Sequence, residues 1–165
     1  MSSNRVSRIQ LLMVMLLLLI LQFYLRPRLW DARVSPDFLL IALMLFAMRS
    51  SPGVAALAGF AVGVIVDTLT PARFGAGALA HTLVGYLGSW GRSVFFADNV
   101  LVNAGFVAAG LWIRDFIVLV ASGTDHRQLI TELTLYSPLQ ALTTAGFALI
   151  VLVTFRNMFS IRLDP

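Results

Sequence analysis

The sequence contains no cysteine and no lysine, and it has few charged residues of any kind. Without cysteine the chain has no disulfide, no thiolate nucleophile, no cysteine-ligated metal and no site for palmitoylation or prenylation. All 12 basic residues are arginine, which excludes Schiff-base catalysis by lysine. The two histidines, His81 and His126, are too few for a histidine-rich metal centre. We therefore predict no cofactor, no metal and no catalytic residues.

Apolar residues are what the sequence has in excess. Of its 165 residues 59% are hydrophobic and 12% are charged, whereas soluble domains average about 45–50% and about 25%. This composition predicts an all-α integral membrane protein with a single membrane domain over residues 1–165. The net charge of +4 is typical of nucleic-acid binding, but arginines that flank membrane spans explain it more simply.

Apolar runs and helix-start signals predict a compact bundle of about six transmembrane helices, since one span needs about 17–25 residues. Ser-Pro pairs at 35–36, 51–52 and 137–138 precede three of the runs, and serine before proline favours a helix start. Arg26-Pro27-Arg28 follows the first run, where a signal peptide would have its cleavage site, so we interpret this run as an uncleaved span. The predicted spans are 9–25, 36–50, 52–68, 75–95, 99–121 and 138–156.

Parts of this topology stay open on the sequence alone. A five-span alternative makes 36–68 a re-entrant hairpin. The polar segment before the last span carries Leu129, Leu133 and Tyr136 on one helical face, which predicts an interfacial helix over about 126–136. The arginines divide almost evenly between the two sides of the membrane. An arginine pair ahead of the first span favours both termini in the cytoplasm.

Charged residues inside the predicted spans are the candidates for function. Arg114 and Asp115 interrupt the fifth span, where a charge costs at least about 2.5–3.5 kcal/mol. One interpretation is an intramembrane polar network of Asp67, His81, Arg114 and Asp115, with Arg114 paired to Asp67. The other is structural: Arg114 reaches the interface with Trp112 as its anchor, Asp67 ends a helix, and His81 is a packing residue.

Small residues recur at helical spacing in the third and fourth spans. Ala55, Gly59 and Gly63 form one stripe, and Gly85 and Gly88 belong to a second smooth surface. Such surfaces let helix backbones approach closely, and close packing is what associates helices in lipid. The stripes indicate either internal packing or a docking surface for another membrane helix.

Short motifs frame the middle of the chain: Pro36-Asp37-Phe38-Leu39-Leu40, Gly59-Phe60-Ala61-Val62-Gly63 followed by Asp67, Phe74-Gly75, and Gly85-Tyr86-Leu87. Together they resemble the rod shape-determining protein MreD family, most closely over 36–92. The resemblance implies a multi-pass component of the bacterial inner membrane that serves the cell-elongation machinery. It also implies a fold similar to the substrate-binding subunits of energy-coupling-factor transporters.

The same resemblance implies partners and no reaction. Members act with MreC, and through it with MreB and the peptidoglycan polymerase pair of RodA and its penicillin-binding partner. The expected function is a non-enzymatic scaffold in contact with membrane lipid, with no nucleic acid. The alternative is a small-solute or lipid-precursor binding or transport subunit. The two differ in whether the intramembrane polar residues line a polar cavity or are paired with one another.

Overall fold

The computed structural model describes residues 3–29, 31–71, 74–94 and 99–155, and its regular elements within these ranges are all helical. The predicted span ends at 95 and 156 lie outside the described residues. The elements are α1 (Ser3–Ile20), the π-helical η1 (Leu21–Leu25), the 3₁₀ turn η2 (Arg26–Arg28), α2 (Phe38–Ala47), α3 (Pro52–Leu69), α4 (Ala76–Val94), α5 (Val100–Ala121), α6 (His126–Thr131), the π-helical η4 (Glu132–Tyr136) and α7 (Ser137–Thr154).

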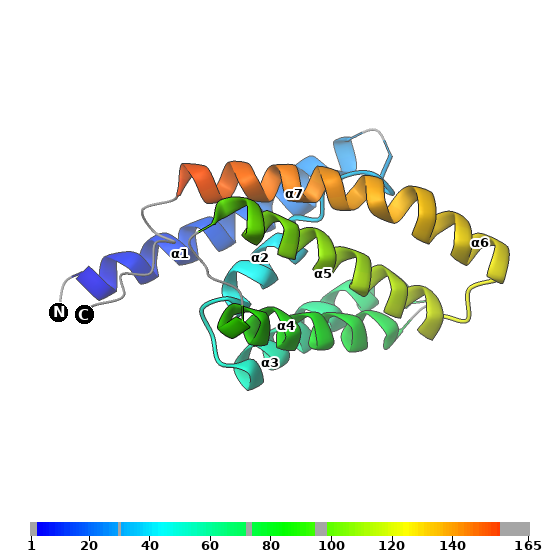
Figure 1. Cartoon of the computed structure of the whole chain (residues 1–165), viewed down its shortest axis with the longest axis horizontal. Helices are drawn as coiled ribbons and strands as arrows, with labels where there is room; N and C mark the ends of the chain where they lie inside the picture. Colours follow the sequence, from blue (N-terminus) through cyan, green and yellow to red (C-terminus); the bar gives the residue numbers. More distant parts are fainter. Residues whose placement is uncertain (1–2, 30, 72–73, 95–98, 156–165) are drawn as a thin grey trace.

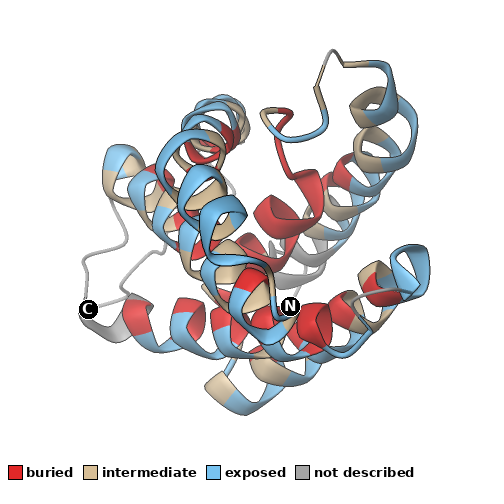
Figure 2. Cartoon of the chain, turned by 90° about the vertical axis from the view of Figure 1, so that its right-hand side faces the viewer, coloured by how far each residue is buried: buried red, intermediate tan, exposed pale blue. Residues whose placement is uncertain are grey.

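The helices form a bundle around α2. Helix α3 packs closely along α4, α5 packs against both α4 and α7, and α2 contacts α1, α3, α4, α5 and α7. Helix α1 begins and α7 ends at the same end of the bundle (Figure 1). Buried residues gather at the centre of the end-on view (Figure 2), because nine of the ten residues of α2 are buried.

Helix α2 is shorter than the sequence predicts and begins inside the protein. At about 1.5 Å per residue its ten residues extend about 15 Å, half of a hydrocarbon core of about 30 Å. We expected a start at Ser35, but the hydroxyl of Ser35 donates to the carbonyl of Asp31 (2.7 Å). The cap is Asp37, whose carboxylate accepts the N–H of Leu40 (3.0 Å). The start of the helix therefore moves two residues along the chain.

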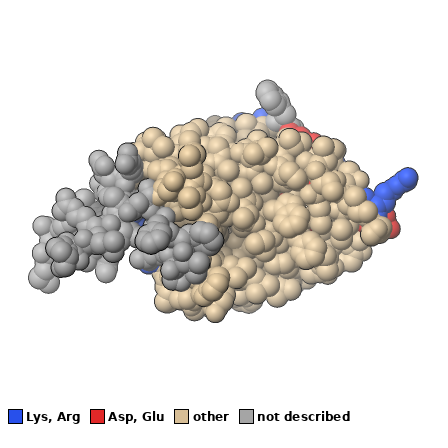
Figure 3. All heavy atoms as spheres, in the orientation of Figure 1, with Lys and Arg blue, Asp and Glu red and all other residues tan. Residues whose placement is uncertain are grey.

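Within the described residues, four helical segments are long and apolar enough to cross a membrane, and α2 is a shorter apolar helix. Helix α4 is not among the four, because glycine, serine and histidine interrupt its apolar residues. Among the described atoms in Figure 3, the charged side chains lie at the edges of the face and beside the grey atoms, and the rest of the face is uncharged, as expected for a surface in lipid. The chain is therefore a helical membrane protein, and its count of six spans stays a prediction. The four segments are Leu11–Arg28, Pro52–Leu69, Val100–Ala121 and His126–Thr154.

The last part of the chain differs from the predicted separate helix over 126–136. Here α6, η4 and α7 form one continuous helix from His126 to Thr154. Pro138 has no N–H to donate to the preceding helical turn. The backbone just before it adopts the wider π-helical turn η4, so the helix continues without a break. The indole N–H of Trp112 donates to the carbonyl of Leu133 (3.2 Å) within this turn. This hydrogen bond links α5 to η4.

The glycine stripe of α3 lies against α4. A Cβ added at Gly59 would overlap the carbonyl of His81, and one added at Gly63 would overlap the backbone of Gly77 and Ala78. From the other side, a Cβ at Gly85 would overlap the carbonyl of Ala55. Gly88 faces the side chains of Met44 and Ala47 in α2 instead. These small residues are therefore occupied by internal packing in this structure.

This packing predicts that a single methyl group at Gly59 destabilises the bundle. Gly59→Ala forces apart two helix backbones, and overpacking of this kind costs about 1–3 kcal/mol. The matched control is Gly105→Ala in α5, because Gly105 is exposed and nothing lies within 4 Å of its added Cβ. Thermal unfolding in detergent should show a lower midpoint for the first variant and an unchanged or higher one for the second. Equal midpoints would contradict the packing described here.

Candidate functional site: a buried polar cluster at the start of α2

Polar side chains from four helices meet at the N-terminus of α2. The turns η1 and η2, which continue α1, provide an amide and a guanidinium. Helix α2 provides its capping carboxylate, α5 provides an ion pair, and α7 provides an amide and a hydroxyl. We call this group the α2 cap cluster: Gln22, Arg26, Asp37, Arg114, Asp115, Gln140 and Thr144.

The cluster satisfies the backbone groups that a helix start leaves unpaired. The N–H of Phe38 donates to Oε1 of Gln22 (3.0 Å), and the N–H of Asp37 donates to Oγ1 of Thr144 (3.1 Å). The carboxylate of Asp37 accepts from Leu40 in the same turn. A buried N–H without a partner costs about as much free energy as a lost hydrogen bond, so these bonds permit α2 to begin inside the protein.

The carboxylate of Asp37 also forms ion pairs with two arginines of the cluster. Its Oδ2 lies 3.0 Å from Nη2 of Arg114 and 3.9 Å from Nη1 of Arg26. Arg114 Nε lies 3.2 Å from Oδ1 of Asp115, the next residue on α5. The side chain of Asp37 is 5% exposed, that of Arg114 13% and that of Arg26 23%. Two guanidinium groups and two carboxylates thus balance in charge within the protein.

The predicted pair of Arg114 and Asp67 does not form among the described residues. The Asp67 carboxylate instead caps α4: Oδ2 accepts the N–H groups of Gly75 and Ala78, and Oδ1 accepts that of Gly77, each at 2.9 Å. Gly75 reaches this position with φ +96°, a left-handed conformation that glycine adopts without strain. Asp67, 2% exposed, therefore has a structural role between α3 and α4.

His81 is a buried residue of α4. It is 1% exposed, and its Nδ1 is 2.8 Å from the carbonyl of Gly77, one turn earlier. Of the predicted network, then, the structure pairs Arg114 with Asp115, uses Asp67 to cap α4, and gives His81 a hydrogen bond within its own helix.

Sequence reasoning missed the residue at the centre of the cluster. Asp37 was available as a signal, because a carboxylate directly after Pro36 and before ten apolar residues is typical of an N-cap. Gln22 and Thr144 gave no comparable signal, since single polar residues in apolar helices reveal nothing about which backbone they contact. Their roles follow from the packing of α1 and α7 against α2.

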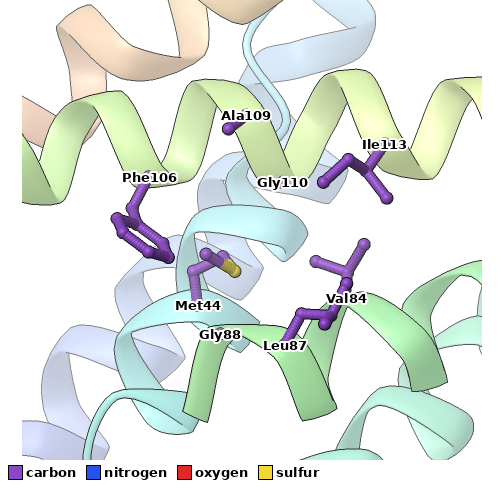
Figure 4. Close-up of a pocket in the computed structure, with 8 residues that line it drawn as sticks. All are labelled: Met44, Val84, Leu87, Gly88, Phe106, Ala109, Gly110 and Ile113. Carbon is purple, nitrogen blue, oxygen red and sulfur yellow. The ribbon is translucent and has the colours of Figure 1, made fainter. Parts of the chain in front are cut away.

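A separate apolar pocket of about 50 Å³ lies between α2, α4 and α5. Figure 4 shows Phe106 and Ile113 of α5 and Leu87 of α4 around it, with Met44 of α2 directed between the two helices. Gly88 and Gly110 face Met44, which leaves the space that a larger side chain would fill. The lining has no polar surface, and the α2 cap cluster contributes none of its residues to it.

The ion pair predicts a specific pattern of coupling between substitutions. Arg114→Met should destabilise the protein by about 3–5 kcal/mol, because it leaves a buried carboxylate without its close partner. Adding Asp37→Asn, which keeps an oxygen for Leu40, should cost less than the sum of the two changes. The matched control combines Arg114→Met with Asp67→Asn, and these effects should add. Coupling to Asp67 in place of Asp37 would contradict the pairing described here.

The Asp67 cap predicts a second effect on stability. Asp67→Asn removes one of two accepting oxygens and the charge that strengthens all three bonds, at a cost of about 1–3 kcal/mol. Thr68→Ala is the control, because Thr68 is exposed and its hydroxyl bonds within its own helix. Surface changes of this kind stay within about 0.5 kcal/mol. Comparable losses in both variants would argue against the cap.

Comparison with known proteins gives one result. The family model of the rod shape-determining protein MreD matches residues 3–160. No curated protein and no solved structure matches the chain, so the predicted similarity to transporter subunits stays a prediction. Because the match extends over nearly the whole sequence, the chain belongs to the MreD family, a family of membrane proteins with a role in determining rod shape.

Proposed function

We propose that this member of the MreD family is a non-enzymatic scaffold of the bacterial inner membrane. It holds MreC, and through MreC it helps to organise peptidoglycan synthesis by the elongation machinery. Both termini lie in the cytoplasm in this proposal. The family membership supports the role in rod shape, and the interior of the bundle supports a scaffold over a transporter.

The observation that carries the proposal is how the intramembrane charges are used. Asp67 accepts three backbone N–H groups, and Asp37, Arg114 and Asp115 are paired with one another. The apolar pocket beside Met44 has no polar group with which to select a solute. A binding or transport subunit needs polar groups directed at its ligand, whereas here these groups stabilise the fold.

The surface available to MreC is also constrained. The stripe of Ala55, Gly59 and Gly63 is buried against α4, so MreC would contact other faces of the bundle. Long apolar side chains are exposed on several helices, including Leu16 of α1 and Leu142 of α7. A single-span partner would pack its helix against one of these faces within the bilayer.

Because the chain has no cysteine, single-cysteine variants can locate this face without background. We expect a cysteine in the MreC span to cross-link with one exposed position or with neighbouring ones. The buried Ala148→Cys is the matched negative control. The exposed positions for single substitution are Leu16 in α1, Leu57 in α3, Ala109 in α5 and Leu142 in α7.

Co-purification of MreC with each variant is measured in parallel. Cross-links spread equally over all four helices would argue against a defined helix contact. Failure of the unsubstituted chain to co-purify with MreC would overturn the proposed partner itself. A co-purified small solute in its place would favour the transport alternative.

A further inference from the structure

The apolar pocket between α2, α4 and α5 is bordered by a glycine that close helix packing does not require. A Cβ at Gly59 would overlap the backbone of α4, so that position depends on the absence of a side chain. A Cβ at Gly110 of α5 would instead meet side-chain atoms of Met44 and Val84 at 3.3–3.4 Å. Methionine is unbranched and adapts its shape to its neighbours. Gly110 therefore keeps space open beside a flexible side chain, and no second backbone lies against it.

The interior of the pocket limits what can occupy this space. Its volume is about 50 Å³, and its lining has no polar surface. A bound water needs about two to four polar partners, so the pocket excludes water and any charged or hydrogen-bonding ligand. An engineered cavity of about 150 Å³ holds one benzene ring, and this pocket has about a third of that volume. A narrow hydrocarbon chain fits, whereas a ring does not.

The pocket opens to the outside of the bundle at the depth where such chains end. Leu87 and Ala109, on either side of it, are both exposed. Ala109 and Gly110 are the tenth and eleventh of the 22 residues of α5, which places them about 15 Å from either end of the helix. The hydrocarbon core of a bilayer is about 30 Å thick, so its middle lies at the same depth. Lipids have the methyl ends of their acyl chains there.

We propose that this pocket binds the methyl end of one phospholipid acyl chain, which enters from the bilayer between α4 and α5. Dispersion contacts with the apolar lining hold the chain, and Met44 adjusts to its position. A side chain from a partner helix fits less well, because helices in lipid approach one another over small residues. Leu87 and Trp112, three residues after Ala109, are large and project beside the opening. The site is independent of the proposed scaffold function.

Solid-state nuclear magnetic resonance of the full chain in phosphatidylcholine bilayers tests the site. The methionine methyl groups are labelled with carbon-13, and the Met44 signal is identified by its loss in Met44→Leu. One lipid sample is labelled at the terminal methyl group of the chains, and a second at the chain carbon next to the carboxyl group. We expect transfer from the terminal methyl group to Met44, several-fold above that from the second label. Met44 is 1% exposed, so without an occupied pocket its methyl group contacts protein atoms alone.

Filling the pocket should remove this contact. Gly110→Leu should reduce the transfer several-fold, and Gly110→Ala, whose Cβ meets side chains alone, should reduce it in part if the larger residue prevents folding. The matched control is Gly105→Leu on the exposed face of the same helix, where nothing lies within 4 Å of an added Cβ, and it should leave the transfer unchanged.

Four results would overturn the proposal. They are no transfer from the terminal methyl group in the unsubstituted chain, equal transfer from both labels, transfer from water to Met44, and transfer that no substitution at Gly110 reduces. The same measurement on the chain reconstituted with MreC addresses the other occupant. We expect the lipid contact to persist there. Its replacement by a contact with MreC would assign the pocket to a side chain of the partner helix.

Discussion

A helix that begins inside a membrane protein must have its first N–H groups satisfied by the protein itself, and α2 imposes this constraint on the whole bundle. Its N-terminus takes an oxygen from Gln22 of η1, the continuation of α1, and one from Thr144 of α7. Its own cap, Asp37, brings a buried charge that Arg114 of α5 neutralises. Three helices are thus held at fixed positions around α2 by polar groups whose separation would be costly.

The pair of α3 and α4 is held by a different kind of interaction. In lipid there is no hydrophobic force between apolar helices, so close backbone contact must provide the attraction. Gly59 and Gly63 permit that contact, and the carboxylate of Asp67 bonds the end of α3 to the start of α4. A larger side chain at Gly59 or Gly63 would therefore push α3 and α4 apart. In the α2 cap cluster, by contrast, the damaging change is the removal of one member of a buried pair.

The difference between what was and was not predictable follows from the range of the interactions. Membrane class and the presence of helices depend on local composition, and four apolar segments in the described residues bear this out. The partner of Arg114 depends on which carboxylate α5 meets in space. Asp37 and Asp67 both lie beside apolar runs, so sequence spacing gives no means of choosing between them. The length of α2 was missed for the same reason, since its start is set by contacts with α1 and α7.

Helix α4 packs against α3 on one side and against α2 and α5 on the other. The contacts with α3 involve the turn from Gly77 to His81. The N–H of Gly77 bonds Asp67 at the end of α3, and its carbonyl accepts from His81. The carbonyl of His81 lies against Gly59 of α3, and further along α4 Gly88 lies against Met44 of α2. A displacement of α4 would therefore disturb its contacts with both α3 and α2. Purely apolar helices can slide past one another at little cost, but buried polar groups have few positions in which they are satisfied. Such an interior keeps the helices at fixed relative positions, and the proposed scaffold role requires this of a protein that holds a partner.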